Sequence, residues 1–172
     1  MTDTNAFVVD NKKFEKEGLD PAGPFLFQVA NVRATEKKYG NAEDAVTVPI
    51  IQMKLVATHT VETDSDGLVT GEVEVRPIMR NYEDFALTGP SSRKLKTLYQ
   101  AITGRGITGG NGSHTDLLSA AEELVGGSAW NNVFHSKFTR QDGSTGFKAM
   151  LTNTFKSKPP KSFRPRTEET EE

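Results

Sequence analysis

The sequence predicts a single, mainly β domain that contains a helical insert. Three observations support this fold class: strand-like stretches come first, two amphipathic helical patterns follow, and the pattern of a long hairpin comes last. A chain of 172 residues is long enough for one domain with its own apolar core. We therefore expect one folded unit flanked by polar ends.

Three strand-like stretches open the domain. The first covers residues 25–33 and ends at the turn-rich segment 37–41. The second, 46–58, alternates apolar and polar residues, and Pro49 near its start indicates an edge or a bulge. The third, 72–82, places valines on one face and charged residues on the other. These three stretches predict the first three strands of one sheet.

Two helices are predicted next. The first begins after the turn signal at 89–92 and ends at Gly104. The second begins at Ser113 or Thr115 and ends at Gly126. The apolar positions that recur at helical spacing are Leu95, Leu98, Tyr99, Ile102, Leu117, Leu118, Ala121, Leu124 and Val125. These residues are expected to form the apolar side of each helix.

A long hairpin is predicted around the turn signal Asp142-Gly143. Its aromatic and apolar residues share parity on each strand, and the sets are Trp130, Phe134 and Phe138, then Phe147, Ala149, Leu151 and Phe155. Such alternation favours the interior of a barrel. Five strands with helices between the third and fourth follow the order of the OB barrel. Another small α+β roll and a sandwich with a helical excursion are the alternatives.

The chain ends differ from the body in composition. We expect an N-terminal arm over 1–24, an OB-like domain over 25–157 and a disordered tail over 158–172. The segment 137–166 carries eight basic side chains and one acidic one, although the whole chain has a net charge of −2. The tail then ends in four acidic residues, Glu168, Glu169, Glu171 and Glu172.

No pattern of catalytic or metal-binding residues stands out. The chain has no cysteine, and His59, His114 and His135 lack the spacing of metal ligands. The glycine-rich segment 104–109 has the letters of a dinucleotide fingerprint, but it follows a helix and not a strand, so a connector is the better interpretation. We expect a binding protein without metal or cofactor, and not an enzyme.

The N-terminus and the overall hydropathy bear on location. The first residues are polar and carry no apolar signal region, and no stretch approaches the ~20 apolar residues that cross a bilayer. We expect an intracellular, cytoplasmic protein without membrane contact.

Basic and aromatic residues form the most suggestive candidate site. Single-stranded DNA is held by cations along its phosphates and by aromatic rings that stack on its bases. The residues that an OB barrel would place on its binding loops and third strand are Lys37, Lys38, Tyr39, Arg76, Arg80, Tyr82, Lys137, Arg140 and Lys148. The competing interpretation is a solvated charged face over a core that takes up the hairpin aromatics.

The acidic end of the tail has two interpretations. It can be a solubilising extension, or its glutamates can compete with DNA for a basic groove and recruit replication or recombination proteins. Both interpretations remain open at the level of sequence.

The chain resembles the phage-encoded single-stranded DNA-binding proteins of OB type. The shared features are the strand order, the helix with Leu95, Leu98 and Ile102, the short acidic helix before Gly126, the hairpin 130–155 and the acidic end. The resemblance implies binding of single-stranded DNA without sequence specificity during replication or recombination, in the host cytoplasm and often as a homo-oligomer. The alternatives are a phage structural or adaptor protein with flexible terminal arms and, more remotely, a nuclease built from scattered carboxylates.

Overall fold

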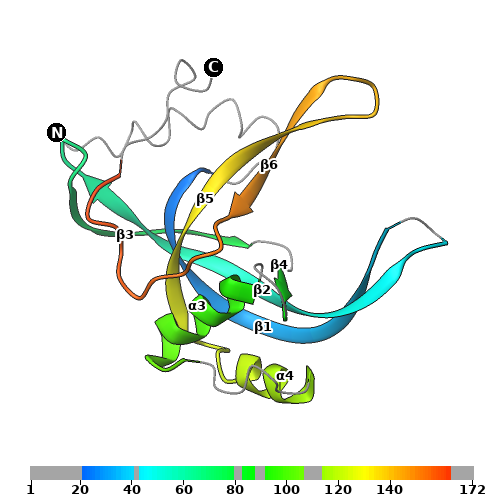
Figure 1. Cartoon of the computed structure of the whole chain (residues 1–172). Coiled ribbons are helices and arrows are strands. Elements are labelled where there is room, and N and C mark those ends of the chain that lie inside the picture. The colour runs from blue at the N-terminus through cyan, green and yellow to red at the C-terminus, as the bar shows by residue number, and fades with distance from the viewer. Residues whose placement is uncertain (1–20, 41–42, 80–82, 88–91, 107–113, 164–172) are drawn as a thin grey trace.

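The protein is described here by a computed structural model (Figure 1). The described residues are 21–40, 43–79, 83–87, 92–106 and 114–163. The predicted N-terminal arm lies outside them except for residues 21–24, and so do residues 164–172 of the predicted tail.

The described chain is mainly β, as predicted, with six strands in one antiparallel sheet and two helices. The strands are β1 (Gly23–Tyr39), β2 (Val46–Thr63), β3 (Val69–Met79), β4 (Glu83–Ala86), β5 (Ser128–Thr139) and β6 (Thr145–Leu151). The helices are α3 (Arg93–Thr103) and α4 (His114–Glu122). The predicted helical insert therefore lies between the early strands and the final hairpin, as expected.

The sheet has the order β3-β2-β1-β5-β6, with β4 pairing separately with β2. The predicted third strand, 72–82, corresponds to β3, which pairs with the second half of β2. The sequence did not predict β4, which pairs with Ile50–Met53 in the first half of β2. β3 and β6 form the two ends of the order, and no ladder joins them within the residues described. The sheet is thus six-stranded and not closed into the predicted five-stranded barrel.

Pro49 is paired with a neighbouring strand on only one side of β2. It lies opposite Glu36 of β1, and the ladder with β4 begins only at Ile50. Proline lacks the amide hydrogen that a second neighbour would need. The edge position that the sequence predicted for Pro49 is therefore confirmed on this side of β2.

The apolar core lies between the curved sheet and the two helices. Its centre is formed by buried residues of β1 and β2, among them Phe27, Met53 and Leu55. Helix α3 adds Leu98, and the segment after α4 adds Leu124. The periodic leucines predicted this face, whereas Val125, which was predicted on it, is half exposed.

The predicted Asp142-Gly143 turn is present, and a second Asp-Gly turn, at 64–67, joins β2 to β3. The carboxylate of Asp64 accepts the amides of Asp66 and Leu68, both at 2.9 Å, and Gly67 takes the left-handed conformation that such a turn requires. At the other turn Asp142 accepts the amide of Ser144 at 2.9 Å. The hydroxyl and amide of Ser144 hold the pKa of the Asp142 carboxyl below its usual value.

The chain after β6 forms a strap, here defined as residues 155–163. Lys156 exchanges two backbone hydrogen bonds with Trp130 of β5, of 2.7 and 2.9 Å. Farther along, the carbonyl of Lys161 accepts the amide of Val69, and the amide of Phe163 donates to Gly67, so the strap crosses to the β2–β3 turn. The expected disordered tail is therefore wrong for residues 158–163, because these backbone hydrogen bonds fix them to the sheet.

Candidate nucleic-acid interface

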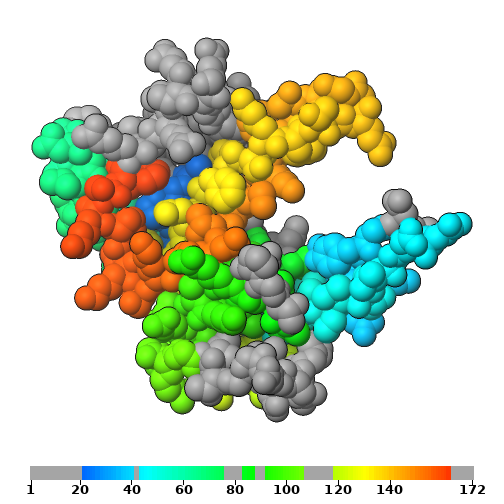
Figure 2. Space-filling model, viewed as in Figure 1, coloured from blue at the N-terminus to red at the C-terminus, as the bar shows by residue number. Residues whose placement is uncertain are grey.

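Two hairpin arms extend from the body of the protein. The β1–β2 arm consists of residues 33–48, most of them exposed, and the β5–β6 arm consists of residues 134–148. Both arms project on the same side of the molecule (Figure 1). Figure 2 shows a hollow between them, open to solvent. The residues that the sequence placed on the first turn and on the final hairpin belong to these two arms.

The first predicted group lies at the end of the β1–β2 arm. Lys37, Lys38 and Tyr39 are the last residues of β1, although the sequence predicted a turn here. The ladder with β2 continues to Tyr39 opposite Val46, which explains the longer strand. Tyr39 is 50% exposed, and the ammonium group of Lys37 lies 5.8 Å from its ring centroid. An exposed ring beside a cation is a suitable platform for a nucleobase next to a phosphate.

Lys37 also has an acidic partner that the sequence did not reveal. Its ammonium group lies 2.5 Å from the carboxylate of Asp84 on β4, and the amide of Gln52 donates to the same carboxylate at 2.6 Å. The hydrogen bond to Asp84 raises the pKa of Lys37. Burial acts to raise the pKa of Asp84, but the bonds from Lys37 and Gln52 outweigh it, so that this pKa is lowered. Part of the positive charge of this arm is thus balanced within the protein.

A further cation lies on the same face of the β1–β2 arm. Arg33 shares parity with Lys37 and Tyr39 on β1, and its Nε donates to Gln52 at 2.9 Å. Lys54 lies next along the same face, because it pairs with Asn31 two positions before Arg33. The sequence interpretation did not include Arg33 and Lys54. The period-two spacing of Arg33 with Lys37 on β1 was the signal that could have identified Arg33. Lys54 is on β2, and only the pairing of the two strands places it on this face.

The second predicted group lies on the β5–β6 arm. Lys137 pairs with Phe147, and Lys148 pairs with Ser136, so the two lysines point to opposite faces of the arm. The ammonium group of Lys137 lies 5.9 Å from the ring of Phe147. The guanidinium of Arg140 lies 5.6 Å from the ring of Phe138 and donates to the carbonyl of Thr145 at 2.6 Å. Each face of this arm therefore combines a cation with an aromatic ring.

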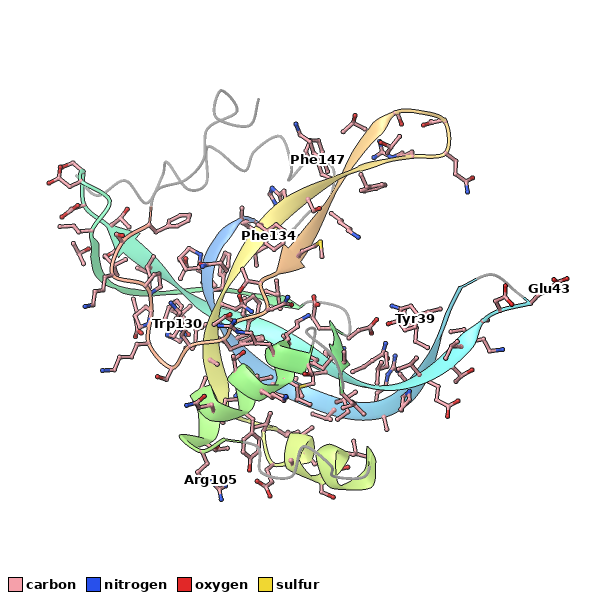
Figure 3. All side chains as sticks on the ribbon, in the orientation of Figure 1. Tyr39, Glu43, Arg105, Trp130, Phe134 and Phe147 are labelled. Atoms are coloured by element: carbon pink, nitrogen blue, oxygen red, sulfur yellow. The ribbon has the colours of Figure 1, made fainter. Side chains whose placement is uncertain are left out.

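The aromatic residues of the hairpin divide into two sets. Trp130 and Phe155 are buried, as the core interpretation expected. Phe134 and Phe138 are each 41% exposed, so that interpretation is wrong for them. They share a face with Trp130, but only Trp130 is covered by the strap. Figure 3 shows Phe134 and Phe147 on this arm and Tyr39 on the other.

The remaining predicted residues are not placed. Arg76 belongs to β3, but its side chain is not described. Arg80 and Tyr82 lie outside the described residues, as do the four glutamates Glu168, Glu169, Glu171 and Glu172. Two of the three predicted basic and aromatic groups are therefore located, one on each side of the hollow.

The part of the chain that the structure describes holds no group of three or more histidine, aspartate or glutamate side chains arranged to bind a metal ion. Among the same residues, no helix has both the length and the apolar character to cross a bilayer. No protein-family model matches the chain, and neither a curated protein nor a solved structure shows significant similarity to it. The geometry of the two arms is therefore the basis for assigning a function.

Proposed function

We propose that the protein binds single-stranded DNA without sequence specificity, in the hollow between the two arms, during phage DNA replication or recombination. The observation that carries the proposal is the matching chemistry of the arms: on each arm a cation lies 5.6–5.9 Å from the centroid of an aromatic ring, and the hollow lies between the two arms (Figure 2). This combination suits a ligand that alternates phosphate groups and flat bases.

The topology supports an OB-like fold. An OB fold is a partly open five-stranded barrel that binds oligonucleotides with two loops, one between its first and second strands and one between its fourth and fifth. If β3 and β4 count as one interrupted strand, the β1–β2 and β5–β6 arms correspond to these two loops. The helices α3 and α4 occupy the connection between the third and fourth strands. We therefore propose an OB-like domain whose sheet is open between β3 and β6.

In this proposal the affinity for DNA comes from two interactions, the attraction between basic side chains and phosphates and the stacking of bases on aromatic rings. Lys38, Lys137 and Lys148 are exposed and can follow phosphates, while Tyr39 and Phe138 offer ring faces to bases. Stacking contributes about 1–3 kcal/mol per base, and each neutralised phosphate releases counterions. Neither interaction distinguishes one base from another. Stacking on an inserted ring also requires bases that are not already paired and stacked, which favours single strands.

Fluorescence anisotropy of a labelled oligo-dT, titrated with the full chain at two salt concentrations, tests the proposal. We expect binding that weakens steeply as salt rises, since released counterions oppose binding at high salt. Tyr39→Ala should weaken binding about 5- to 150-fold, corresponding to the loss of one stacked base. Val125→Ala is the matched control, because Val125 is equally exposed but belongs to the segment after α4.

A negative result has a clear meaning. If the full chain binds no oligo-dT at low salt, single-strand binding is excluded and the structural or adaptor role becomes the better account. Light scattering after size-exclusion chromatography would then test that role, which predicts a defined ring or filament without affinity for DNA.

A further inference from the structure

A cavity of about 440 Å³ lies on the body of the protein, apart from the residues assigned to the arms. Its walls are formed by the beginning of β1, the first part of β5, the beginning of α3, the segment that follows β6 and the strap. Trp130 contributes to one wall, and Figure 3 shows it at the centre of the molecule, away from Tyr39. Cavities of a few hundred cubic ångströms hold ligands about as large as a nucleotide.

The charge of the cavity has one sign. Arg93 of α3 and Lys156 and Lys158 of the strap line it, and none of its described lining residues is acidic. Among the described residues these three cations have no carboxylate partner, whereas Lys94, one position from Arg93, forms an ion pair with Glu83 at 3.1 Å. Uncompensated charges of one sign around a concave surface concentrate their field and attract counter-ions.

The wall that holds these cations is rigidly built. The amide of Asn131 donates to the carbonyl of Thr152 at 3.0 Å, and the hydroxyl of Thr152 donates back to the Asn131 oxygen at 2.5 Å. Two backbone hydrogen bonds join Lys156 to Trp130, and the amide of Phe155 donates to the hydroxyl of Thr97 on α3 at 2.9 Å. The cavity is thus formed before any ligand arrives, which lowers the entropy cost of binding.

Further donors complete the cavity. The side chains of Asn132 and Thr154 line it, and within the described chain neither side chain has a hydrogen-bond partner. Arg93 is the first residue of α3, whose first turn contains no acidic residue, so the positive end of this helix adds to the same field. Guanidinium, ammonium, amide and hydroxyl groups together form a donor set that suits a phosphate oxygen cluster.

We propose that this cavity binds the phosphate group of a nucleotide-sized ligand. The group can come from a free nucleotide or from the phosphorylated end of a DNA strand, and both present the same chemistry to Arg93, Lys156 and Lys158. The proposal is separate from binding between the arms, because none of the arm residues contributes to the cavity.

Tryptophan fluorescence gives a direct test. Trp130 is the single tryptophan of the chain, so its emission reports on the wall of the cavity. The full chain would be titrated in a phosphate-free, low-salt buffer with thymidine 5′-monophosphate, with pyrophosphate and with thymidine. We expect a saturable change with the two phosphorylated ligands and none with thymidine. No change with either phosphorylated ligand, or an equal change with thymidine, would overturn the proposal.

Matched variants separate the cavity from general surface charge. Lys158→Ala should weaken binding of thymidine 5′-monophosphate about tenfold, the effect of one lost charge-assisted hydrogen bond. Lys161→Ala, in the same strap but not on the cavity wall, should leave it unchanged. Equal weakening by both variants would show that the anion is held by the charge of the strap as a whole and would contradict the assigned cavity.

The source of the phosphate is decided with oligo-dT that carries a 5′-phosphate, a 3′-phosphate or neither. Tighter binding of one phosphorylated strand, lost in Lys158→Ala, identifies a strand end as the ligand. Equal binding of all three strands, together with the fluorescence change by thymidine 5′-monophosphate, identifies a free nucleotide. If the cavity does not bind phosphate, the affinity for unphosphorylated oligo-dT stays intact. If the arms do not bind DNA, that affinity is absent, so the two outcomes are distinguishable.

Discussion

The two arms carry similar chemistry but differ in how their charge is balanced. On the β1–β2 arm, Lys37 forms an ion pair with Asp84, and Gln52 shares the carboxylate. On the β5–β6 arm, Arg140 donates to a neutral carbonyl, and Lys137 lies over the ring of Phe147. The difference indicates that the β5–β6 arm has more uncompensated charge to offer to phosphates, and that the β1–β2 arm depends more on the ring of Tyr39.

Removal of charge from the β5–β6 arm should have the largest effect on DNA binding. The triple variant Lys137→Ala, Lys148→Ala, Arg140→Ala is expected to lower the slope of log affinity against log salt by about 1.4, the value for two lost phosphate contacts on a single strand. Two contacts are expected and not three, because Lys148 and the Arg140–Phe138 pair share one face of the arm and Lys137 lies on the other. Titrations at several salt concentrations measure this slope.

The matched double variant on the other arm is Lys37→Ala, Lys38→Ala. It should lower the slope by about 0.7, because only Lys38 is free of the bond to Asp84. If this double variant changes the slope as much as the triple variant does, the proposed difference between the arms is wrong.

A methyl group added at Gly146 tests the ring and cation of the β5–β6 arm. A Cβ at this position would lie 2.6 Å from the ring of Phe138 and 2.8 Å from the guanidinium of Arg140. Gly146→Ala should therefore displace both side chains and weaken binding of oligo-dT severalfold. Because both displaced side chains are exposed at the end of an arm, Tm should change little.

For Gly146→Ala, circular dichroism measures the change in Tm and anisotropy measures the change in affinity for DNA, so the two effects are separated on the same samples. Unchanged affinity together with an unchanged Tm would show that Phe138 and Arg140 do not contact DNA. Gly143 would be a poor control, since its left-handed conformation strains any other residue, and Lys161→Ala serves instead.

Removal of the Lys37–Asp84 ion pair should have the smallest effects, a small loss of stability and a small gain in affinity for DNA. Asp84→Asn should lower stability by about 0–1 kcal/mol, since both partners are partly exposed and solvent screens them. It should raise the affinity for DNA slightly, because Lys37 gains freedom to contact phosphate. Unfolding in denaturant and anisotropy measure the two quantities, and weaker DNA binding by this variant would contradict the assignment.

The same pair predicts a pH dependence. The pKa of Asp84 is lowered in the folded chain, so the pair contributes its stability above the unfolded pKa of an aspartate and loses it as the pH falls through the lower, folded pKa. At acidic pH the wild type should lose this small contribution to its free energy of unfolding, and Asp84→Asn, which lacks the carboxylate, should not. Comparison of their unfolding free energies from neutral pH to below pH ~4 checks this.

Local patterns in the sequence were sufficient for most of the fold. Period-two alternation and Asp-Gly turns identified β2 and the β5–β6 hairpin, because these signals depend only on neighbouring residues. The pairing of β4 with β2 could not be read from the sequence, since it joins segments about 30 residues apart. The partner of Lys37 was missed for the same reason.

Exposure and order at the ends of elements were harder to predict. Alternation showed that Trp130, Phe134 and Phe138 share a face, but not that the strap covers only the first of them. The prolines and charges of the strap are typical of disorder, and no local signal reveals that its backbone pairs with β5 and with the β2–β3 turn. The cavity bounded by the strap was therefore missed as well.

Ultraviolet crosslinking of the full chain to oligo-dT, followed by peptide mapping, tests the central claim most directly. DNA that lies between the arms should crosslink to both of them, at Tyr39 on the β1–β2 arm and at Phe134 or Phe138 on the β5–β6 arm. Crosslinks confined to one arm, or found only on the helices α3 and α4, would contradict binding in the hollow.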